Sequence, residues 1–253
     1  LMQNKISLVI PIYNEAGHLE SFLSQVDALV LPGEKELIFV NDKSSDNSQE
    51  ILDQFKFSST VKIIHHEVNK GKGAALRTGI LSATGDFIGI QDADFEYSMD
   101  EIPSLLQPLL DDKADVVYGS RFKKSEQVHR TYHYLVNRIL TLMSNMACGL
   151  YVTDMETCYK FFRADILKNV KLESERFGFE PEITAKIAKL HVRVRELPIS
   201  YFPRNYLQGK KITWKDGVAA LWHILTFSML RNLDQSFTRD LPKGYIPESS
   251  NWL

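Results

Sequence analysis

The chain has 253 residues, 44% of them hydrophobic and 25% charged, and its formal net charge is −2 at pH 7. This composition is ordinary for a soluble globular protein with a substantial core, and it excludes a general electrostatic attraction to nucleic acid. No apolar run reaches the roughly 18 residues of a membrane span, and the N-terminus does not resemble a signal peptide. We therefore expect a cytoplasmic or peripheral protein whose two cysteines, Cys148 and Cys158, are free thiols without a catalytic role.

Apolar segments rich in β-branched residues alternate with helical segments over the first half of the chain. Buried strands are predicted at residues 6–13, 36–42, 61–66, 86–92 and 115–120. The intervening helices are predicted to begin near Glu15, Ser45, Gly71 and Met99. This alternation predicts right-handed crossovers and an α/β fold with a mainly parallel sheet.

The second half of the chain is less regular. Helices are predicted at residues 129–150 and 180–190, and strands at residues 157–163 and 192–202. The segment 217–233 suits either a core helix or a helix at a membrane interface, and the core interpretation is favoured. The tail after Asp240 is expected to be irregular.

Polar residues follow each strand of the first half, where a parallel sheet places its ligands. The fourth strand is followed by a cluster of carboxylates at Asp92, Asp94, Glu96, Asp100 and Glu101. Carboxylates at alternating positions suit Mg²⁺ or Mn²⁺, which prefer oxygen ligands and share their remaining positions with phosphate oxygens. A solvated acidic loop is the alternative at this point.

Two other turns could bind a nucleotide. The segment "NKGKGAALRTG", which contains Lys72, opens a helix where backbone N–H groups favour anions, although it matches neither a P-loop nor a dinucleotide-binding motif. A glycine turn entering an exposed basic helix would explain it equally well. Asp42 could accept hydrogen bonds from a base or ribose. Ser44, Ser45 and Asp46 are suited to cap the next helix, a role that accounts for one or two of them but not for all.

Basic residues are spread over three segments of the chain: Arg121, Arg130, Arg204, Lys210 and Lys211. Each one alone suits an ordinary surface position. Their placement beside strand ends and in a late loop allows them to converge on phosphate, which guanidinium groups bind in a bidentate manner.

Seven motifs occur in one order that resembles family 2 glycosyltransferases. They are "VIPIYNEAGHL", "VNDKSSDNS", "NKGKGAALRTGI", "GDFIGIQDAD", "DVVYGSRF", "DMETCYKFFRADIL" and "FGFEPEITAKIAK". The resemblance runs from about Ile6 to Trp222 and is strongest to the dolichol-phosphate mannose synthase branch, which includes bacterial polyprenyl-phosphate glycosyltransferases.

This resemblance implies a GT-A fold, in which a nucleotide-sugar-binding, mainly parallel sheet is flanked by helices. Residues 1–212 would form the catalytic domain, and residues 213–253 an amphipathic helix and tail packed on it or on the membrane surface. The implied reaction is an inverting transfer of a hexose, mannose or glucose, from a GDP or UDP sugar to a polyprenyl or dolichyl phosphate. It would use Mg²⁺ or Mn²⁺, at the cytoplasmic face of a membrane.

The resemblance also assigns roles by position. The nucleotide sugar would contact Pro11, Tyr13, Glu15, Val40, Asp42, Asp92, Ala93 and Asp94, together with Lys72 of the glycine-rich turn. Arg204 and Lys210 would belong to a loop that closes over the donor. Asp94 and Glu96 would face the metal ion, and Arg121 and Arg130 would meet the acceptor phosphate, so that Asp94, Arg121 and Arg130 form the catalytic set.

One motif departs from the family, because residues 41–44 read Asn-Asp-Lys-Ser where relatives usually have Asp-Asp-Gly-Ser. A polyprenyl phosphate is already anionic and needs no general base, whereas a saccharide hydroxyl would need one, from Glu180 or Asp154. A saccharide or other soluble acceptor, and a nucleotide-sugar-binding protein without turnover, therefore stay open as alternatives.

Overall fold

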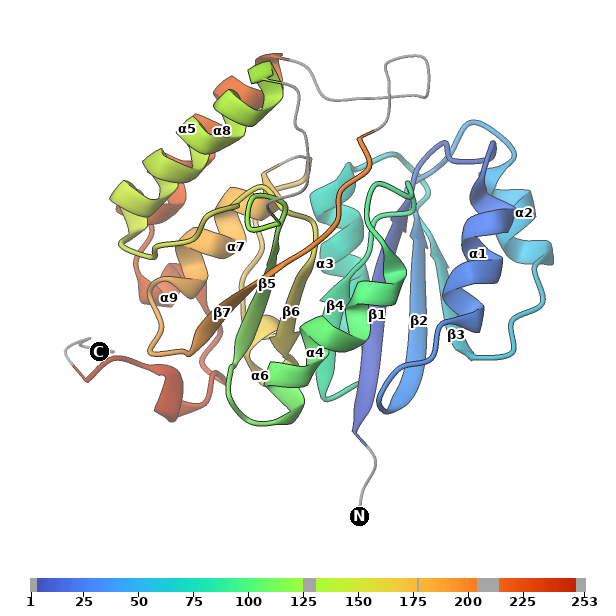
Figure 1. Cartoon of the computed structure of the whole chain (residues 1–253), viewed down its shortest axis with the longest axis horizontal. Helices are drawn as coiled ribbons and strands as arrows, with labels where there is room; N and C mark the ends of the chain where they lie inside the picture. The colour runs from blue at the N-terminus through green and yellow to red at the C-terminus, as the bar shows by residue number, and fades with distance from the viewer. Residues whose placement is uncertain (1–3, 125–130, 177, 204–213, 249–253) are drawn as a thin grey trace.

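The structure, a computed structural model, describes residues 4–124, 131–176, 178–203 and 214–248. Within these ranges a seven-stranded sheet has the order β3-β2-β1-β4-β6-β5-β7 (Figure 1). Its strands are β1 (Lys5–Ile12), β2 (Glu34–Asn41), β3 (Thr60–His65), β4 (Phe87–Ile90), β5 (Val116–Ser120), β6 (Lys160–Arg163) and β7 (Val194–Pro198). The predicted α/β fold with a mainly parallel sheet is confirmed.

Helices connect the strands of the first half as the alternation predicts. They are α1 (Leu19–Ala28), α2 (Ser48–Gln54), α3 (Lys72–Ser82), the short η1 (Met99–Glu101) and α4 (Ile102–Leu110). The second half contains α5 (Thr131–Cys148), α6 (Ala164–Leu167), α7 (Phe179–Ile187), α8 (Trp214–Leu225), the π-helical η3 (Thr226–Leu230), α9 (Leu233–Ser236) and η4 (Lys243–Tyr245). The tail after Asp240 holds only η4 among its described residues.

Strand directions decide which loops meet. β1 pairs in parallel with β2 and β4, whereas β6 runs antiparallel to both β4 and β5. The segment that precedes β6 therefore lies at the same edge of the sheet as the segments that follow β1, β2, β4 and β5. We call this edge the carboxyl edge, and the opposite one the amino edge.

The start of α3 is packed inside the protein. Residues 73–76 are buried, and a Cβ atom at Gly73 would overlap the carbonyl oxygen of Ser174. The amide of Gly73 donates to Arg176 O and that of Ala74 to Glu175 O. The glycine turn thus allows close packing on residues 174–176, and the alternative of an exposed basic helix is wrong.

The C-terminal helices pack on α5 and α7, and α5 lies beside α8 (Figure 1). Ala220, Ile224 and Phe227 are buried there, whereas Trp222 and Met229 are 65% and 69% exposed. The segment 217–233 is therefore a core helix on one side only, and its outward side is also apolar. Among the described residues, none of the helices combines the length and apolar character that crossing a bilayer requires.

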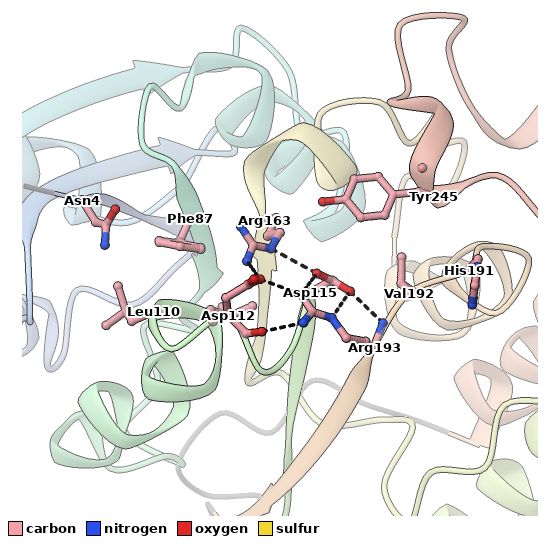
Figure 2. A pocket seen from close by; sticks show the side chains of 12 residues that line it. Asn4, Phe87, Leu110, Asp112, Asp115, Arg163, His191, Val192, Arg193 and Tyr245 are labelled. Carbon is pink, nitrogen blue, oxygen red and sulfur yellow. Dashed lines mark hydrogen bonds and ion pairs between the residues drawn. The ribbon is translucent and has the colours of Figure 1, made fainter. Parts of the chain in front are cut away.

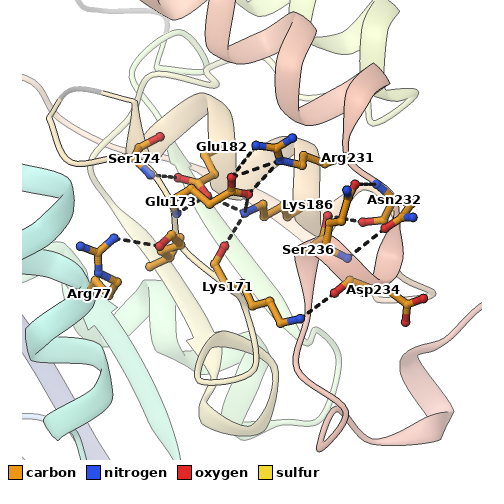
Figure 3. Close-up of polar contacts among 12 residues, drawn as sticks. Arg77, Lys171, Glu173, Ser174, Glu182, Lys186, Arg231, Asn232, Asp234 and Ser236 are labelled. Carbon is orange, nitrogen blue, oxygen red and sulfur yellow. Dashed lines mark hydrogen bonds and ion pairs between the residues drawn. The ribbon is translucent and has the colours of Figure 1, made fainter.

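A buried ion cluster fixes this C-terminal part to α7 (Figure 3). Lys186 is fully buried and lies 2.6 Å from Glu182, and it also contacts Glu173 at 3.1 Å. Arg231 binds Glu173 through two guanidinium nitrogens. Because each charge has a partner, the cluster joins the residue between η3 and α9, Arg231, to α7 through Glu173.

Candidate active site

The acidic turn after β4 is held in a defined shape at the carboxyl edge. The Asp94 carboxylate accepts a hydrogen bond from the amide of Glu96 at 3.1 Å. The Glu96 carboxylate accepts one from the Tyr201 hydroxyl at 3.0 Å, and its carbonyl accepts the amide of Phe202. Two carboxylates therefore stand at fixed positions directly beyond a buried strand.

Phe95, between these two acids, has an unusual backbone conformation. Its φ of 57° lies in the left-handed region, which bulky residues rarely adopt. Its ring packs at 5.6 Å, edge to face, on Phe22 of α1 and at 5.7 Å on His18. The imidazole of His18 in turn hydrogen-bonds Ala93 O at 2.8 Å. These contacts hold the strained turn against the start of α1.

Lys72 lies between two acids from distant parts of the chain. Its ammonium group is 2.8 Å from Asp92 and 2.9 Å from Glu180. Burial alone would lower the pKa of Lys72, but Asp92 and Glu180 raise it well above the usual value, so the ammonium stays charged. Burial likewise opposes ionisation of Glu180, yet Lys72 and Lys160 hold the pKa of Glu180 below 4.5.

Asp42 organises the glycine-rich turn. Its buried carboxylate accepts hydrogen bonds from the amides of Lys70 and Gly71, at 2.9 and 2.6 Å, and lies 2.7 Å from His66 Nδ1. These contacts come from the protein itself and give the buried Asp42 carboxylate a structural role. Binding of a base or ribose by Asp42 stays a prediction.

The serines after β2 join two loops and do not cap α2. The amide of Asn14 donates to Ser44 Oγ at 3.0 Å, and the amide of Ser45 donates to Asn14 Oδ1 at 2.7 Å. Of these three residues only Asp46 contacts the first turn of α2, accepting the amide of Ser48 at 3.0 Å. Capping therefore accounts for one of the three, as expected for one or two of them.

The Arg121 guanidinium is buried against an acid that the sequence did not link to it. Its Nε and Nη2 donate to the Asp154 carboxylate at 2.7 and 2.6 Å, and its amide donates to the same carboxylate at 2.9 Å. The guanidinium also lies 5.0 Å from the centre of the Tyr201 ring. Contact of Arg121 with an acceptor phosphate stays a prediction, and Asp154 already serves as the partner of Arg121.

The structure brings most of the predicted site residues to the carboxyl edge. Pro11, Tyr13, Glu15, Asp42, Lys72, Asp92, Ala93, Asp94 and Glu96 all lie in or beside the loops of that edge. Val40 is fully buried in the core. Arg130, Arg204, Lys210 and Lys211 lie outside the described residues.

A divalent cation at this edge would be held by few protein ligands. Within the described ranges, no group of three or more histidine, cysteine, aspartate or glutamate side chains is arranged to bind a metal ion by itself. Mg²⁺ and Mn²⁺ commonly use one or two carboxylates, water and substrate phosphates. Asp94 and Glu96, two oxygen donors in one fixed turn, fit this pattern.

A cavity of about 750 Å³ lies at the amino edge, the edge opposite the acidic turn. Figure 2 shows side chains that line it. It is lined by Phe87, Asp115, Arg163, Arg193 and Tyr245, among others. Asp115 accepts hydrogen bonds from both arginines, at 3.1 Å from Arg163 and 2.8 Å from Arg193. We interpret this cluster as structural because its charges already neutralise one another.

The model of the glycosyl transferase family 2 matches residues 7–171. This range contains the loops that follow β1 and β2, the acidic turn and the segment before β6. This chain belongs to glycosyl transferase family 2. The resemblance of the seven motifs is thereby confirmed.

Relatives of this glycosyltransferase are about one quarter identical to it. A dolichol-phosphate mannosyltransferase of Pyrococcus furiosus is 27% identical over 216 residues, covering 82% of this chain and 60% of that protein. An undecaprenyl-phosphate mannosyltransferase of Micrococcus luteus is 27% identical over 215 residues, covering 81% and 87%. A UDP-N-acetylglucosamine–dolichyl-phosphate N-acetylglucosaminyltransferase of Methanococcus voltae is 26% identical over 249 residues, covering 90% and 98%.

Solved structures share the architecture. A glucosyl-3-phosphoglycerate synthase from Mycobacterium tuberculosis, in complex with Mn²⁺, UDP and phosphoglyceric acid, has a TM-score of 0.69 at 18% identity. The match covers 90% of this chain and 80% of that one. The fold of this family 2 glycosyltransferase is the predicted GT-A fold.

Proposed function

We propose that this glycosyltransferase moves a hexose from a GDP or UDP sugar to a polyprenyl phosphate, with inversion at the anomeric carbon. The observation that carries the proposal is the fixed acidic turn, Asp92 to Glu96, beside Lys72 at the carboxyl edge of a family 2 fold. Relatives with similar coverage include transferases of mannose and N-acetylglucosamine to undecaprenyl or dolichyl phosphate. The match covers 60% of the length of the Pyrococcus relative, and the activity is proposed for this chain alone.

Asp94 and Glu96 would hold Mg²⁺ or Mn²⁺, which when bound neutralises the negative charge of the departing diphosphate. Lys72, kept charged by Asp92 and Glu180, adds a second positive charge close to the same turn. The acceptor phosphate oxygen is anionic at neutral pH and attacks without deprotonation. The work of the protein is then positioning and charge stabilisation.

Glu180, one of the two bases named from the sequence, is poorly suited to activate a hydroxyl acceptor. A hydroxyl acceptor needs a general base whose pKa is near the working pH. Lys72 and Lys160 overcome the effect of burial and hold the pKa of Glu180 below 4.5, which makes it a weak base. Asp154 is engaged by Arg121. Neither of the two bases named from the sequence therefore suits a saccharide acceptor.

We also propose that the protein binds peripherally at the cytoplasmic face of a membrane, where a lipid acceptor resides. Two helical segments that lie side by side (Figure 1) support this, because each exposes large apolar side chains. They are Leu135, Ile139, Leu142 and Met146 on α5, and Val218, Trp222, Leu225, Met229 and Leu230 on α8 and η3. Phe227 does not belong to this surface because it is buried, and Arg231 is engaged by Glu173.

Titration of GDP and UDP, with and without Mn²⁺, tests the donor site. Asp94→Asn should lower the Mn²⁺-dependent affinity by about a hundredfold, since it removes a charged ligand from the turn. Asp111→Asn, on the exposed end of α4, is the matched control and should leave the affinity unchanged. Equal Mn²⁺ dependence in the wild type and in Asp94→Asn would overturn the metal assignment.

Transfer to a short-chain polyprenyl phosphate, measured with a panel of GDP and UDP hexoses, tests the reaction and identifies the sugar.

Flotation with anionic liposomes tests the membrane contact. Trp222→Ser should reduce the fraction of protein bound to the liposomes several-fold. Val30→Ser, a substitution at an exposed apolar residue outside α5, α8 and η3, should not. Full activity on a water-soluble hydroxyl acceptor, together with failure to float, would favour the alternative function.

A further inference from the structure

The turn that precedes β6, residues 154–157, lies at the carboxyl edge beside the residues that follow β4. β6 is antiparallel to β4, with Gly89 opposite Phe161. Tyr159 donates its hydroxyl to Gln91 Oε1 at 2.7 Å, next to Asp92. The turn is therefore a neighbour of the proposed donor site, although about sixty residues separate them in the chain.

The backbone of this turn is held on several sides. Lys160 is fully buried and donates its ammonium protons to the carbonyl oxygens of Met155, at 2.9 Å, and Thr157. The amide of Asp154 donates to Glu196 at 3.0 Å, and the amide of Met155 to Thr141 Oγ1 at 3.1 Å. The residue between Met155 and Thr157 is thus carried on a fixed backbone.

That residue is Glu156, and the next residue is Thr157; in both, a buried side-chain oxygen lacks the partners that the backbone of the turn has. Glu156 Oε1 is buried and has no hydrogen-bond partner among the described residues. A buried carboxylate oxygen without a donor is costly, and native structures rarely keep one without a reason. The unpartnered atom points to a hydrogen-bond donor that arrives with a ligand.

The surrounding charges restrict the chemistry of that ligand. Burial and the Glu180 carboxylate raise the pKa of Glu156 to about 7, while Lys160 and Arg121 oppose this increase. Acids at Glu180 and Asp154 make the position unfavourable for a phosphate oxygen. A neutral group that donates hydrogen bonds, such as a hydroxyl, complements it.

We propose that Glu156 binds hydroxyl groups of the donor hexose and so contributes to the choice of sugar; this inference rests on the proposed function. Two ion pairs lead from the proposed nucleotide site toward it, because Asp92 pairs with Lys72 and Lys72 with Glu180. The Glu180 carboxylate is close enough to raise the pKa of Glu156. In a nucleotide sugar the hexose follows the diphosphate. Glu156 would therefore lie next to the hexose and not next to the nucleotide.

The test compares two affinities in each variant: that of the nucleotide sugar that the wild type accepts, and that of the matching nucleoside diphosphate, both with Mn²⁺. Glu156→Ala should weaken binding of the nucleotide sugar roughly tenfold to a hundredfold, the usual loss of a charge-assisted hydrogen bond, and leave the diphosphate affinity unchanged. Glu156→Gln, which keeps one acceptor oxygen, should lose less. Asp111→Asn should change neither affinity.

The possible results distinguish failure of the proposed Glu156 role from failure of the proposed glycosyltransferase function. An unchanged ratio of the two affinities in Glu156→Ala would overturn the role of Glu156, whereas absence of diphosphate binding by the wild type would overturn the proposed function. A loss of kcat in Glu156→Gln with unchanged donor affinity would instead make Glu156 a general base for a hydroxyl acceptor. Equal weakening of both ligands, with a lowered melting temperature, would make its role structural.

Discussion

The two edges of the sheet treat buried charge differently. At the amino edge, Asp115 is matched by Arg163 and Arg193, so the cluster in Figure 2 is neutralised within the protein. At the carboxyl edge, Lys72 is shared by two acids, and Glu156 keeps an oxygen without a partner. Charges that serve the fold are compensated by the fold, whereas a site for ligands leaves charges and hydrogen bonds for the ligands to complete.

Substitution of Arg121 should lower the free energy of unfolding most. Although Arg121 lies at the carboxyl edge, it forms a buried ion pair with Asp154 in which each charge neutralises the other. Arg121→Ala leaves the fully buried Asp154 without its counter-ion, which should lower the free energy of unfolding by about 3–5 kcal/mol in urea denaturation. The double variant Arg121→Met with Asp154→Leu should recover most of this loss. A loss below about 1 kcal/mol together with a raised KM for polyprenyl phosphate would instead assign Arg121 to the acceptor.

Asp115→Asn should be the next most damaging change, lowering stability by about 2–3 kcal/mol without changing activity per folded molecule. Burial opposes ionisation of Asp115, but hydrogen bonds from Arg193 hold its pKa below 3.8. Its contribution is therefore complete above pH 3.8 and is lost as pH falls through the lowered pKa. Urea denaturation should accordingly give a constant difference between wild type and variant near neutral pH, which shrinks under acid conditions; a difference that grows there would contradict this.

Glu156→Gln should raise the stability of the protein, whereas the two preceding variants lower it. Because the pKa of Glu156 is raised from 4.5 to about 7, the folded state holds a proton that the unfolded state releases, and this residue costs stability as pH rises through that range. The variant should gain up to about 3 kcal/mol over the wild type at pH 8 and little at pH 4, since one pKa unit corresponds to about 1.4 kcal/mol. Melting temperatures at the two pH values measure this, and equal gains at both would contradict it.

Lys43→Gly should give the smallest effect. Lys43 has a φ of 57°, in the left-handed region that glycine adopts most readily. Removing the side chain should raise stability by about 0.5–1 kcal/mol, which is the cost of that conformation less the extra freedom of glycine in the unfolded chain. Chemical denaturation can resolve this gain, and a loss of stability would indicate that the Lys43 side chain makes a compensating contact.

The elements that could be predicted are those encoded locally. Runs such as residues 36–42 and 61–66 contain enough β-branched and apolar residues to form strands between turns, and the acidic turn followed from its position after such a run. The direction of β6 could not be predicted, because a four-residue strand carries no periodicity that distinguishes parallel from antiparallel pairing.

The partners of the site residues could not be predicted either. Lys72 and Glu180 are 108 residues apart, and Arg121 and Asp154 are 33 apart, so nothing in either local pattern links them. The acid at Asp154 was visible in the sequence as a candidate base, and the buried arginine beside it was visible as a phosphate ligand. Only the fold shows that these two residues neutralise each other.

The packing of Phe95 on α1 has a thermodynamic consequence for binding. His18 and Phe22 tie the acidic turn to the helix that follows Tyr13 and Glu15, so the two loops are ordered together. The conformational entropy of ordering them is lost once, during folding, and not again when a donor arrives. The nucleotide would contact the loop with Tyr13 and Glu15, and the cation would contact the acidic turn. Because both loops are already ordered, neither ligand loses binding free energy to ordering its own loop, and binding of one favours binding of the other.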